Sequence, residues 1–198
     1  YDAAYNHMKT SIANIIRPDA SSYHTFFFDM ATNEPLRGET HQGFSDDSSW
    51  ARGQSWAVYG LALCYHYTHE EAILPLFERV TKYFIDHLPE DYVPYWDLIF
   101  SDGSCEPSDT SAAAIAACGI LEMEKYYHNQ EFLDIAKKMM SSLSEKYTTV
   151  DYLQSNGIIK DGMYSRKHGH KSECTSWGDY FYLEALMRMK KSDWKIYW

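Results

Sequence analysis

The chain has 198 residues, 45% of them apolar, which is enough material for the core of one ordinary domain and excludes a disordered chain. It carries 28 Asp and Glu against 18 Lys and Arg, and this net charge of −10 argues against a nucleic-acid partner. No stretch approaches the roughly 20 apolar residues of a membrane span, so we expect no membrane partner either.

Three segments carry apolar residues on one side of a helix. The first repeats apolar residues from Tyr5 to Ile16 at helical spacing and ends before Pro18. The second covers residues 73–88 and the third residues 132–143, each with a single apolar stripe. We predict three amphipathic helices that face the core on one side and solvent on the other.

Three further segments alternate with these and are apolar on nearly every face. They cover residues 56–65, 112–123 and 177–187, and each follows a start that places Ser or Thr where a side chain can cap a helix. Helices of this composition are buried on all sides. A long, aromatic-rich connection precedes each of these starts.

The alternation of outer and inner helices is a repeat, and the repeat predicts the fold class. Inner helices in a ring with outer helices around them form an α/α toroid. Three pairs make about half of a six-hairpin (α/α)6 barrel, so we predict an all-α chain in which residues 1–198 form a single partial domain. The long connections gather at one end of such a ring and build a site there. Half a ring exposes an apolar flank, so we expect the chain to be part of a longer protein or to complete its ring with another chain.

The cysteine pattern bears on compartment and metals. The four cysteines form no C-x-x-C pair, and Cys64 and Cys118 lie inside apolar runs, where a thiol packs as a small apolar side chain. We therefore expect a reduced, cytoplasmic protein with no cofactor and no structural metal.

Segment 40–56 combines polar and aromatic side chains around the start of an inner helix. Trp50 and Gln54 share one helix face there, and Arg52 and Trp56 share another. An Arg stacked on a Trp ring presents a planar donor pair to a carboxylate, and the helix N-terminus adds partial positive charge. This combination fits an anionic sugar, and the 16% aromatic content fits sugar stacking. The alternative is a capped helix with ordinary buried aromatic residues.

At this segment the chain resembles a known family. Five blocks carry the resemblance in order along nearly the whole chain: SSYHTFFFD, RGETHQGFSDDSSWARGQSWAVYGLAL, YWDL, DTSAAAIAACGILEM and TSWGDYFYLEALMR. They resemble the C-terminal half of the unsaturated glucuronyl hydrolases of glycoside hydrolase family 88, whose fold is an (α/α)6 barrel. The resemblance implies hydration of the C4=C5 double bond of an unsaturated uronic acid at the non-reducing end of a lyase product. Protonation at C4 and addition of water at C5 give a hemiketal that collapses and releases the rest of the sugar, which requires one proton-exchanging carboxyl group.

The resemblance also implies substrate-binding roles for six residues: His24, Gln42, Trp50, Arg52, Trp56 and Tyr164. Arg52 is expected to pair with the uronate carboxylate, and Trp50 and Trp56 to shape the sugar pocket. His24 and Gln42 are expected to hydrogen-bond hydroxyl groups or to position water. Gln54 fits the motif, and it fits helix packing equally well.

No catalytic residue is assigned in this chain. The family's acid/base Asp and a second, assisting Asp belong to the N-terminal half, to which the resemblance does not extend. Five aspartates fall in or near the matching blocks without matching the catalytic position: Asp46, Asp47, Asp97, Asp109 and Asp179. We therefore expect the chain to supply the substrate-binding half and to be inactive alone. Its expected partners are an unsaturated uronic-acid oligosaccharide and either the missing N-terminal half of the barrel or a self-associating partner chain.

Residues 165–171 form a basic cluster in this acidic chain. Some members of the resembled family accept sulfated fragments through an S-x-x-S-x-K pattern near this place. Only Ser165 fits that pattern, because His168 and His170 occupy its later positions. The cluster either contacts the neighbouring sugar or its sulfate, or is a solvated basic loop. A zinc site of these histidines with His41 has no supporting motif.

Two other functions remain open. One is hydrolysis of unsaturated rhamnogalacturonan by the sister family, although the W-A-R-G-Q sequence favours the glucuronyl activity. The other is a non-catalytic, carbohydrate-binding α/α module.

Overall fold

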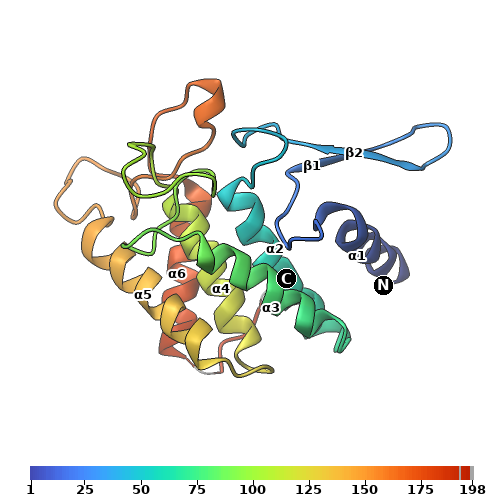
Figure 1. The fold of residues 1–198 in the computed structure, drawn as a ribbon. Helices are drawn as coiled ribbons and strands as arrows, with labels where there is room; N and C mark the ends of the chain where they lie inside the picture. Colours follow the sequence, from blue (N-terminus) through green and yellow to red (C-terminus); the bar gives the residue numbers. More distant parts are fainter. Residues whose placement is uncertain (192, 197–198) are drawn as a thin grey trace.

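Six α-helices alternate in the predicted order along the part of the chain that the structure describes (Figure 1). The structure is a computed structural model that describes residues 1–191 and 193–196. The elements in chain order are α1 (Asp2–Ile15), β1 (Thr25–Phe28), β2 (Pro35–Glu39), α2 (Ala51–Thr68), α3 (Ile73–Asp86), α4 (Thr110–Met123), α5 (Gln130–Lys146), the short 3-10 helix η1 (Arg166–His168) and α6 (Ser176–Lys190).

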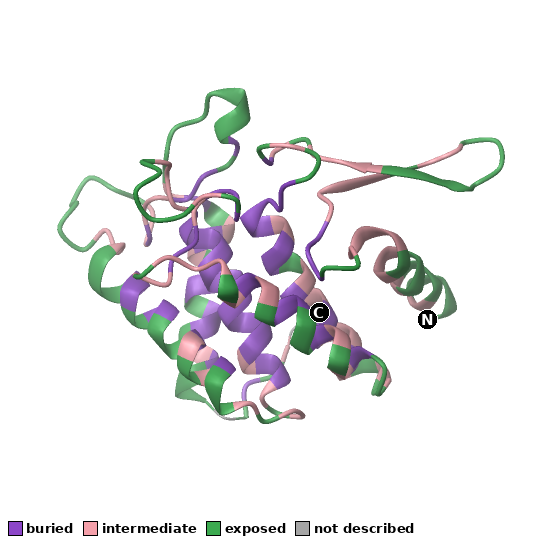
Figure 2. Ribbon diagram, viewed as in Figure 1, coloured by how far each residue is buried: buried purple, intermediate pink, exposed green. Residues whose placement is uncertain are grey.

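Helix α4 is the centre of the inner layer. It packs against α2 on one side and α6 on the other, and every residue of it except Leu121 is buried (Figure 2). Glycine permits this closeness, because a Cβ at Gly119 would lie 2.7 Å from the Cα of Tyr59 on α2. Helices α3 and α5 pack against α2 and α4. This layering confirms the predicted α/α toroid, about half of an (α/α)6 barrel.

The prediction that all three inner helices are buried on every face is wrong for α2 and α6. These two helices end the inner row, so each has an inner neighbour on one side only. Both helices expose large apolar residues: Trp56 and Tyr67 on α2, and Tyr180, Leu183, Leu186 and Met189 on α6. This is the apolar flank that half a ring was expected to expose.

The inner helices begin at the end of the ring where the long connections gather, which we call the site end (Figure 1). Their caps differ from the prediction. The side chain of Thr175 caps α6 as expected, but at α4 the cap is the carboxylate of Asp109, which accepts the Ser111 N–H. Helix α2 has Trp50 at this position and no side-chain cap.

The connection after α1 contains a feature that an all-α prediction omits. Strands β1 and β2 pair antiparallel, with Thr25 opposite Glu39, and form a hairpin that extends away from the helices (Figure 1). The aromatic run in β1 favours a strand over a helix.

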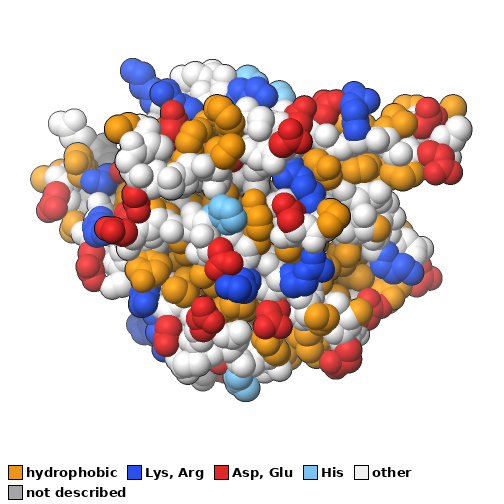
Figure 3. All heavy atoms as spheres, in the orientation of Figure 1, with side chains coloured by type: hydrophobic (Ala, Val, Ile, Leu, Met, Phe, Trp, Pro, Cys, Tyr) orange, Lys and Arg blue, Asp and Glu red, His pale blue; other side chains and the backbone are white. Residues whose placement is uncertain are grey.

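The negative net charge is not concentrated on the face shown in Figure 3, where acidic, basic and apolar side chains are interspersed. Within residues 1–191 and 193–196, no helix combines the length and the apolar character needed to cross a membrane.

Candidate functional site

Arg52 joins the starts of all three inner helices at the site end. It lies in the first turn of α2, and its Nη1 is 2.7 Å from the carboxylate of Asp109, the cap of α4. The same nitrogen donates to the Met163 carbonyl, and Nη2 donates to the Tyr164 carbonyl at 2.8 Å. Arg52 therefore ties the connection before α6 to the beginnings of α2 and α4.

Two tryptophan rings flank the Arg52 guanidinium. Its Cζ lies 4.5 Å from the Trp50 ring and 5.3 Å from the Trp177 ring in the first turn of α6. The Trp177 indole N–H donates to Ser111 Oγ. Burial lowers the pKa of Arg52, and the charge of Asp109 opposes that shift. The predicted Arg–Trp stack thus exists, but on Trp50 and Trp177.

The guanidinium is less available than the sequence led us to expect. Arg52 is only 3% exposed, and both terminal nitrogens are bonded to acceptors of the protein. A buried charge requires such partners, because removing it from water without them costs several kcal/mol. In this structure Arg52 therefore holds the parts of the site together, and its terminal nitrogens are not free to bind a carboxylate.

His24 and Gln42 lie beside this cluster. Nδ1 of His24 accepts the backbone N–H groups of His41 and Gln42, both at 3.0 Å, so its ring proton is on Nε2. The His24 ring is 4.4 Å from the Trp50 ring. Burial, together with the charges of His41 and Arg52, lowers the pKa of His24 to about 4.

Gln42 and Arg52 converge on one acceptor. The Gln42 side chain donates to the Tyr164 carbonyl at 2.8 Å, the same oxygen that Arg52 holds. This bond fixes the backbone at Tyr164, whose exposed ring lies near Trp177 and edge-on to His170. Five of the six sequence-predicted residues are therefore together: His24, Gln42, Trp50, Arg52 and Tyr164.

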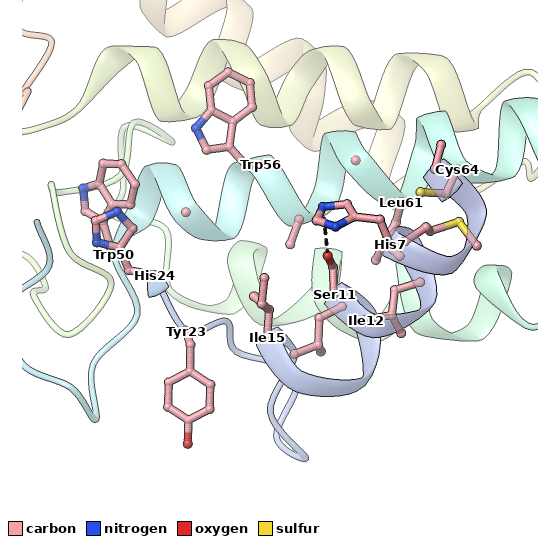
Figure 4. Close-up of a pocket in the computed structure, with 16 residues that line it drawn as sticks. His7, Ser11, Ile12, Ile15, Tyr23, His24, Trp50, Trp56, Leu61 and Cys64 are labelled. Carbon is pink, nitrogen blue, oxygen red and sulfur yellow. Dashed lines mark hydrogen bonds between the residues drawn. The ribbon is translucent and has the colours of Figure 1, made fainter. Parts of the chain in front are cut away.

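Trp56 lies apart from these five, on the side of α2 that faces α6. Its ring packs edge-on against Phe181 of α6 at 5.1 Å and is 37% exposed, and Figure 4 shows it away from Trp50 and His24. Gln54, which had two possible roles, is fully buried and donates to the carbonyls of Ala20 and Val80. Its contacts are those of a packing residue.

The basic segment after Tyr164 reaches the edge of the same site. Ser165 Oγ is 2.6 Å from His168 Nδ1, and the His168 ring is 4.6 Å from that of His41. Among the described residues, no group of three or more His, Cys, Asp or Glu side chains is arranged to hold a metal ion.

Sequence reasoning missed two members of the site, Asp109 and Trp177. Both lie at the repeated helix starts, and this repeat was the feature of the sequence that could have identified them. Their contacts with Arg52 depend on how three segments that are distant in the sequence meet. Asp97 also reaches this end. Burial raises its pKa, and its carboxylate accepts the Phe44 N–H and the Ser48 hydroxyl. Asp97 and Asp109 are both fully buried, so each serves the protein's own loops and helix starts.

An apolar groove runs from this cluster along the bare side of α2. It has a volume of about 390 Å³ and lies between α1 and α2, with Trp50, His24 and Tyr23 at its site end and Cys64 and His7 at the other (Figure 4).

Residues 6–192 match Glycosyl Hydrolase Family 88. The chain belongs to this family. Its whole length is 48% identical to the unsaturated chondroitin disaccharide hydrolase of Streptococcus pneumoniae, of which it covers 51%. Over 89% of its length it is 40% identical to the unsaturated glucuronyl hydrolase of Bacillus sp. (strain GL1), of which it covers 48%.

A crystal structure of the unsaturated glucuronyl hydrolase from Streptococcus agalactiae superimposes on 98% of this chain with a TM-score of 0.93 and 46% identity, and the chain covers 50% of it. A mutant of that hydrolase complexed with dGlcA-GalNAc6S matches all of this chain and 54% of the mutant, with a TM-score of 0.88 and 46% identity. These matches confirm the family resemblance. The family 88 chain described here spans about half the length of the curated relatives it matches.

Proposed function

We propose that this family 88 chain is the substrate-binding part of a hydrolase that hydrates the C4=C5 bond of a non-reducing-end unsaturated uronic acid in lyase-derived oligosaccharides. The hemiketal formed at C5 then collapses and releases the rest of the oligosaccharide from the hydrated uronate. The observation that carries the proposal is the convergence of Trp50, Arg52, Gln42 and Tyr164 at the starts of the inner helices. Relatives named for unsaturated chondroitin disaccharides support this substrate class.

The geometry suggests a role for each proposed substrate-binding residue. The Tyr164 ring is the exposed aromatic surface of the cluster, and Gln42 and Arg52 position it through its carbonyl. Neutral His24 retains an Nε2–H that can donate to a sugar hydroxyl or a water molecule. Trp50 and Trp56 line the groove that adjoins the cluster.

Electrostatics at the site end favour an anion despite the negative net charge. Three helix N-termini converge there, and each carries partial positive charge. Arg52 adds a full charge that Asp109 and two backbone carbonyls balance locally. Because this charge is balanced, Arg52 contributes to uronate binding by holding the backbone at Tyr164.

The proton donor comes from outside this chain in our proposal. We call the part of the relatives that this chain does not cover the complementary half. A carboxyl group of that half protonates C4, and water then adds at C5. The carboxylates that this chain brings to the site, Asp97 and Asp109, are buried and hydrogen-bonded, which supports assigning no catalytic residue here.

Turnover in the presence and absence of the complementary half tests the proposal. The chain is mixed with the complementary half of the S. pneumoniae relative and given an unsaturated chondroitin disaccharide, and loss of the ultraviolet absorbance of the C4=C5 bond is followed. We expect turnover by the mixture and none by the chain alone. Gln42→Ala is expected to lower kcat/KM about tenfold, equivalent to about 1.4 kcal/mol, whereas Gln154→Ala on an exposed loop leaves it unchanged. Turnover by the chain alone would show that it contains its own proton donor.

The same assay separates the two alternatives. An unsaturated rhamnogalacturonan disaccharide that is consumed faster than the chondroitin one would assign the sister activity. The buried state of Asp97 and Asp109 is equally compatible with the second alternative, a non-catalytic carbohydrate-binding module. Disaccharide binding to the chain with no turnover in any mixture would establish that function instead.

We also propose a reducing compartment such as the cytoplasm. Cys64, Cys105, Cys118 and Cys174 are all free thiols, which supports this location.

A further inference from the structure

An aromatic patch lies beside the candidate site, on the connections that precede α2 and α4. Phe44 and Ile99 are 52% and 57% exposed, and the Phe44 ring meets the Phe100 ring edge-on at 5.3 Å. The buried Trp96 ring lies 5.5 Å from the Phe100 ring and also contacts Phe44 edge-on. We call Phe44, Phe100 and the adjoining Ile99 the aromatic platform. Part of the high aromatic content of this chain is thus at the surface, where core packing does not account for it.

A buried carboxylate fixes the position of the platform. Asp97 is fully buried, and its Oδ2 accepts the Phe44 N–H at 2.9 Å. Its Oδ1 accepts the Ile99 N–H at 3.2 Å, so one side chain holds the backbone of both connections. Burying a carboxylate costs free energy that such hydrogen bonds have to offset. The result is a pre-organised surface, which lowers the entropy cost of binding a ligand.

The platform is continuous with the candidate site. Phe44 follows Gln42 by two residues, so their Cα atoms are at most about 7 Å apart. The Gln42 side chain in turn donates to the Tyr164 carbonyl. The backbones of Trp50 and Asp97 pair as an antiparallel bridge, which joins the second connection of the platform to the start of α2. An oligosaccharide whose terminal rings occupy the candidate site can therefore place a later ring on the platform.

Polar groups at the edge of the platform fit a sugar ring. The Trp96 indole N–H donates to Glu106 Oε2 at 2.9 Å, and the half-exposed Arg166 lies 3.5 Å from the same oxygen. Within the residues that the structure describes, no hydrogen bond uses Glu106 Oε1. Aromatic rings with a carboxylate and a guanidinium beside them offer contacts to both the apolar face and the hydroxyl groups of a sugar. An apolar protein surface would desolvate these two charges without bonding them.

We infer that the aromatic platform binds a sugar ring of the same oligosaccharide, next to the terminal disaccharide that occupies the candidate site. The ring stacks on Phe44, and its hydroxyl groups form hydrogen bonds with Glu106 and Arg166. This inference rests on the proposed function for the identity of the oligosaccharide. It is tested by binding, so it can fail while turnover of a disaccharide still supports the proposed function.

The test compares an unsaturated chondroitin disaccharide with the corresponding tetrasaccharide, which adds two rings. Binding of each to the 198-residue chain is measured by isothermal titration calorimetry. Phe44→Ala removes the stacking ring, and Phe44→Leu removes the ring but keeps an apolar side chain, so that the fold is retained. The matched control is Phe27→Ala on the hairpin, which removes a ring of similar exposure away from the site (Figure 1).

We expect the wild-type chain and Phe27→Ala to bind the tetrasaccharide about tenfold more tightly than the disaccharide. Both Phe44 variants should lower the affinity for the tetrasaccharide about fivefold and leave the affinity for the disaccharide unchanged, because only the longer ligand reaches the platform.

Several results would overturn the inference. Equal affinity of the wild-type chain for both lengths would show that no further ring is bound, and a preference that Phe44→Ala retains would place that ring elsewhere. A dimer of the chain, measured by light scattering, that Phe44→Ala dissociates would make the platform a contact between two copies. These three results leave the proposed function intact as long as the disaccharide binds. Binding of the tetrasaccharide that depends on Phe44, without any turnover in the mixture of halves, would contradict the proposed function alone, and binding of neither length would contradict both.

Discussion

Two buried arginines stand at opposite ends of the same inner helices, and their surroundings differ. Arg52 at the site end has one carboxylate partner, Asp109, and otherwise bonds two backbone carbonyls and Ser111. Arg188 at the far end has two carboxylate partners, Glu122 and Glu184. Both side chains are almost fully buried, at 4% and 2% exposure.

The difference distinguishes the Arg52 cluster, which positions the residues of the site, from the Arg188 cluster, which joins the helices of the core. Burial lowers the pKa of Arg52, and Asp109 opposes it only in part. Burial acts in the same direction on Arg188, but the Glu122 hydrogen bond and the charges of Glu184 and Glu122 raise its pKa overall. Arg52 is also bordered by loops and an exposed aromatic ring, whereas Arg188 links α4 to α6 and stacks on Trp194. Burial of an arginine therefore does not by itself indicate function. The surroundings separate the two: loops and an exposed ring border Arg52, whereas Arg188 lies between two inner helices.

The largest effect is expected for Arg52→Ala. This change leaves the Asp109 carboxylate buried without its counter-ion and removes the Arg52 donor from the Met163 carbonyl, so we expect a loss of about 3–5 kcal/mol in the free energy of unfolding. Urea denaturation of the purified chain measures it. Arg37→Ala on the exposed hairpin is the control and should cost less than about 1 kcal/mol. A loss for Arg52→Ala as small as that of the control would contradict the organising role.

The charged cluster around Arg188 should tolerate the replacement of Arg188 and Glu184 together. Arg188→Met alone is expected to cost about 3 kcal/mol, because Glu184 then loses its charge partner while Glu122 keeps Lys125. Adding Glu184→Gln removes the unpaired charge and keeps an acceptor for Tyr59, so most of the loss should be recovered. The pair Arg52→Met and Asp109→Asn should recover less, because the Met163 carbonyl loses the Arg52 donor and the Tyr164 carbonyl keeps only Gln42. If both double variants recover the same free energy of unfolding, the Arg52 and Arg188 clusters do not differ in the way proposed here.

An intermediate effect is expected at Trp177, whose ring and N–H both support the site end. Trp177→Leu removes the ring beneath Arg52 and the bond to Ser111, at a cost of about 1–2 kcal/mol in unfolding free energy. Trp177→Phe keeps a ring and should lose about half as much. If the two variants lose the same amount, the stacking contributes nothing.

The smallest effect concerns pH and is confined to the site end. The pKa of His24 is about 4 in the folded chain, below the ordinary value of 6.5, so the unfolded state binds a proton first as the pH falls. The contribution of neutral His24 is therefore complete above about pH 6.5 and is lost as the pH falls toward 4. Wild-type Tm should decline more over this range than that of His24→Gln. NMR titration of the His24 ring gives a direct check, and an apparent pKa near 6.5 would contradict the structure.

The sequence predicted the helices better than it predicted their surroundings. Apolar spacing located all six helices, because periodicity reflects burial along one chain segment. It predicted the same complete burial for α2 and α6 as for α4, since composition does not reveal whether a helix has a neighbour on both sides. The hairpin at residues 25–39 was read as a connection, because strand pairing joins residues that are distant in sequence.

The candidate site divides in the same way. Five of the six residues implied by the resemblance are brought together, and the helix starts identified by repeat contain the two that were missed, Asp109 and Trp177. Trp56 packs against Phe181 of α6, away from the other five, and Gln54 is a packing residue. The largest difference between expectation and structure concerns Arg52. The sequence predicted a guanidinium free to bind a carboxylate, and in the structure it is buried and bonded to the protein.

By itself, the sequence determined the alternation of outer and inner helices, the end at which the site forms and the family to which the chain belongs. These properties are local or carried by contiguous motifs. Only the tertiary structure decided which groups satisfy Arg52 and which face of α2 stays bare. Those depend on segments that lie far apart in the chain, and the free energy of a buried charge or an apolar groove is set by the neighbours that meet there.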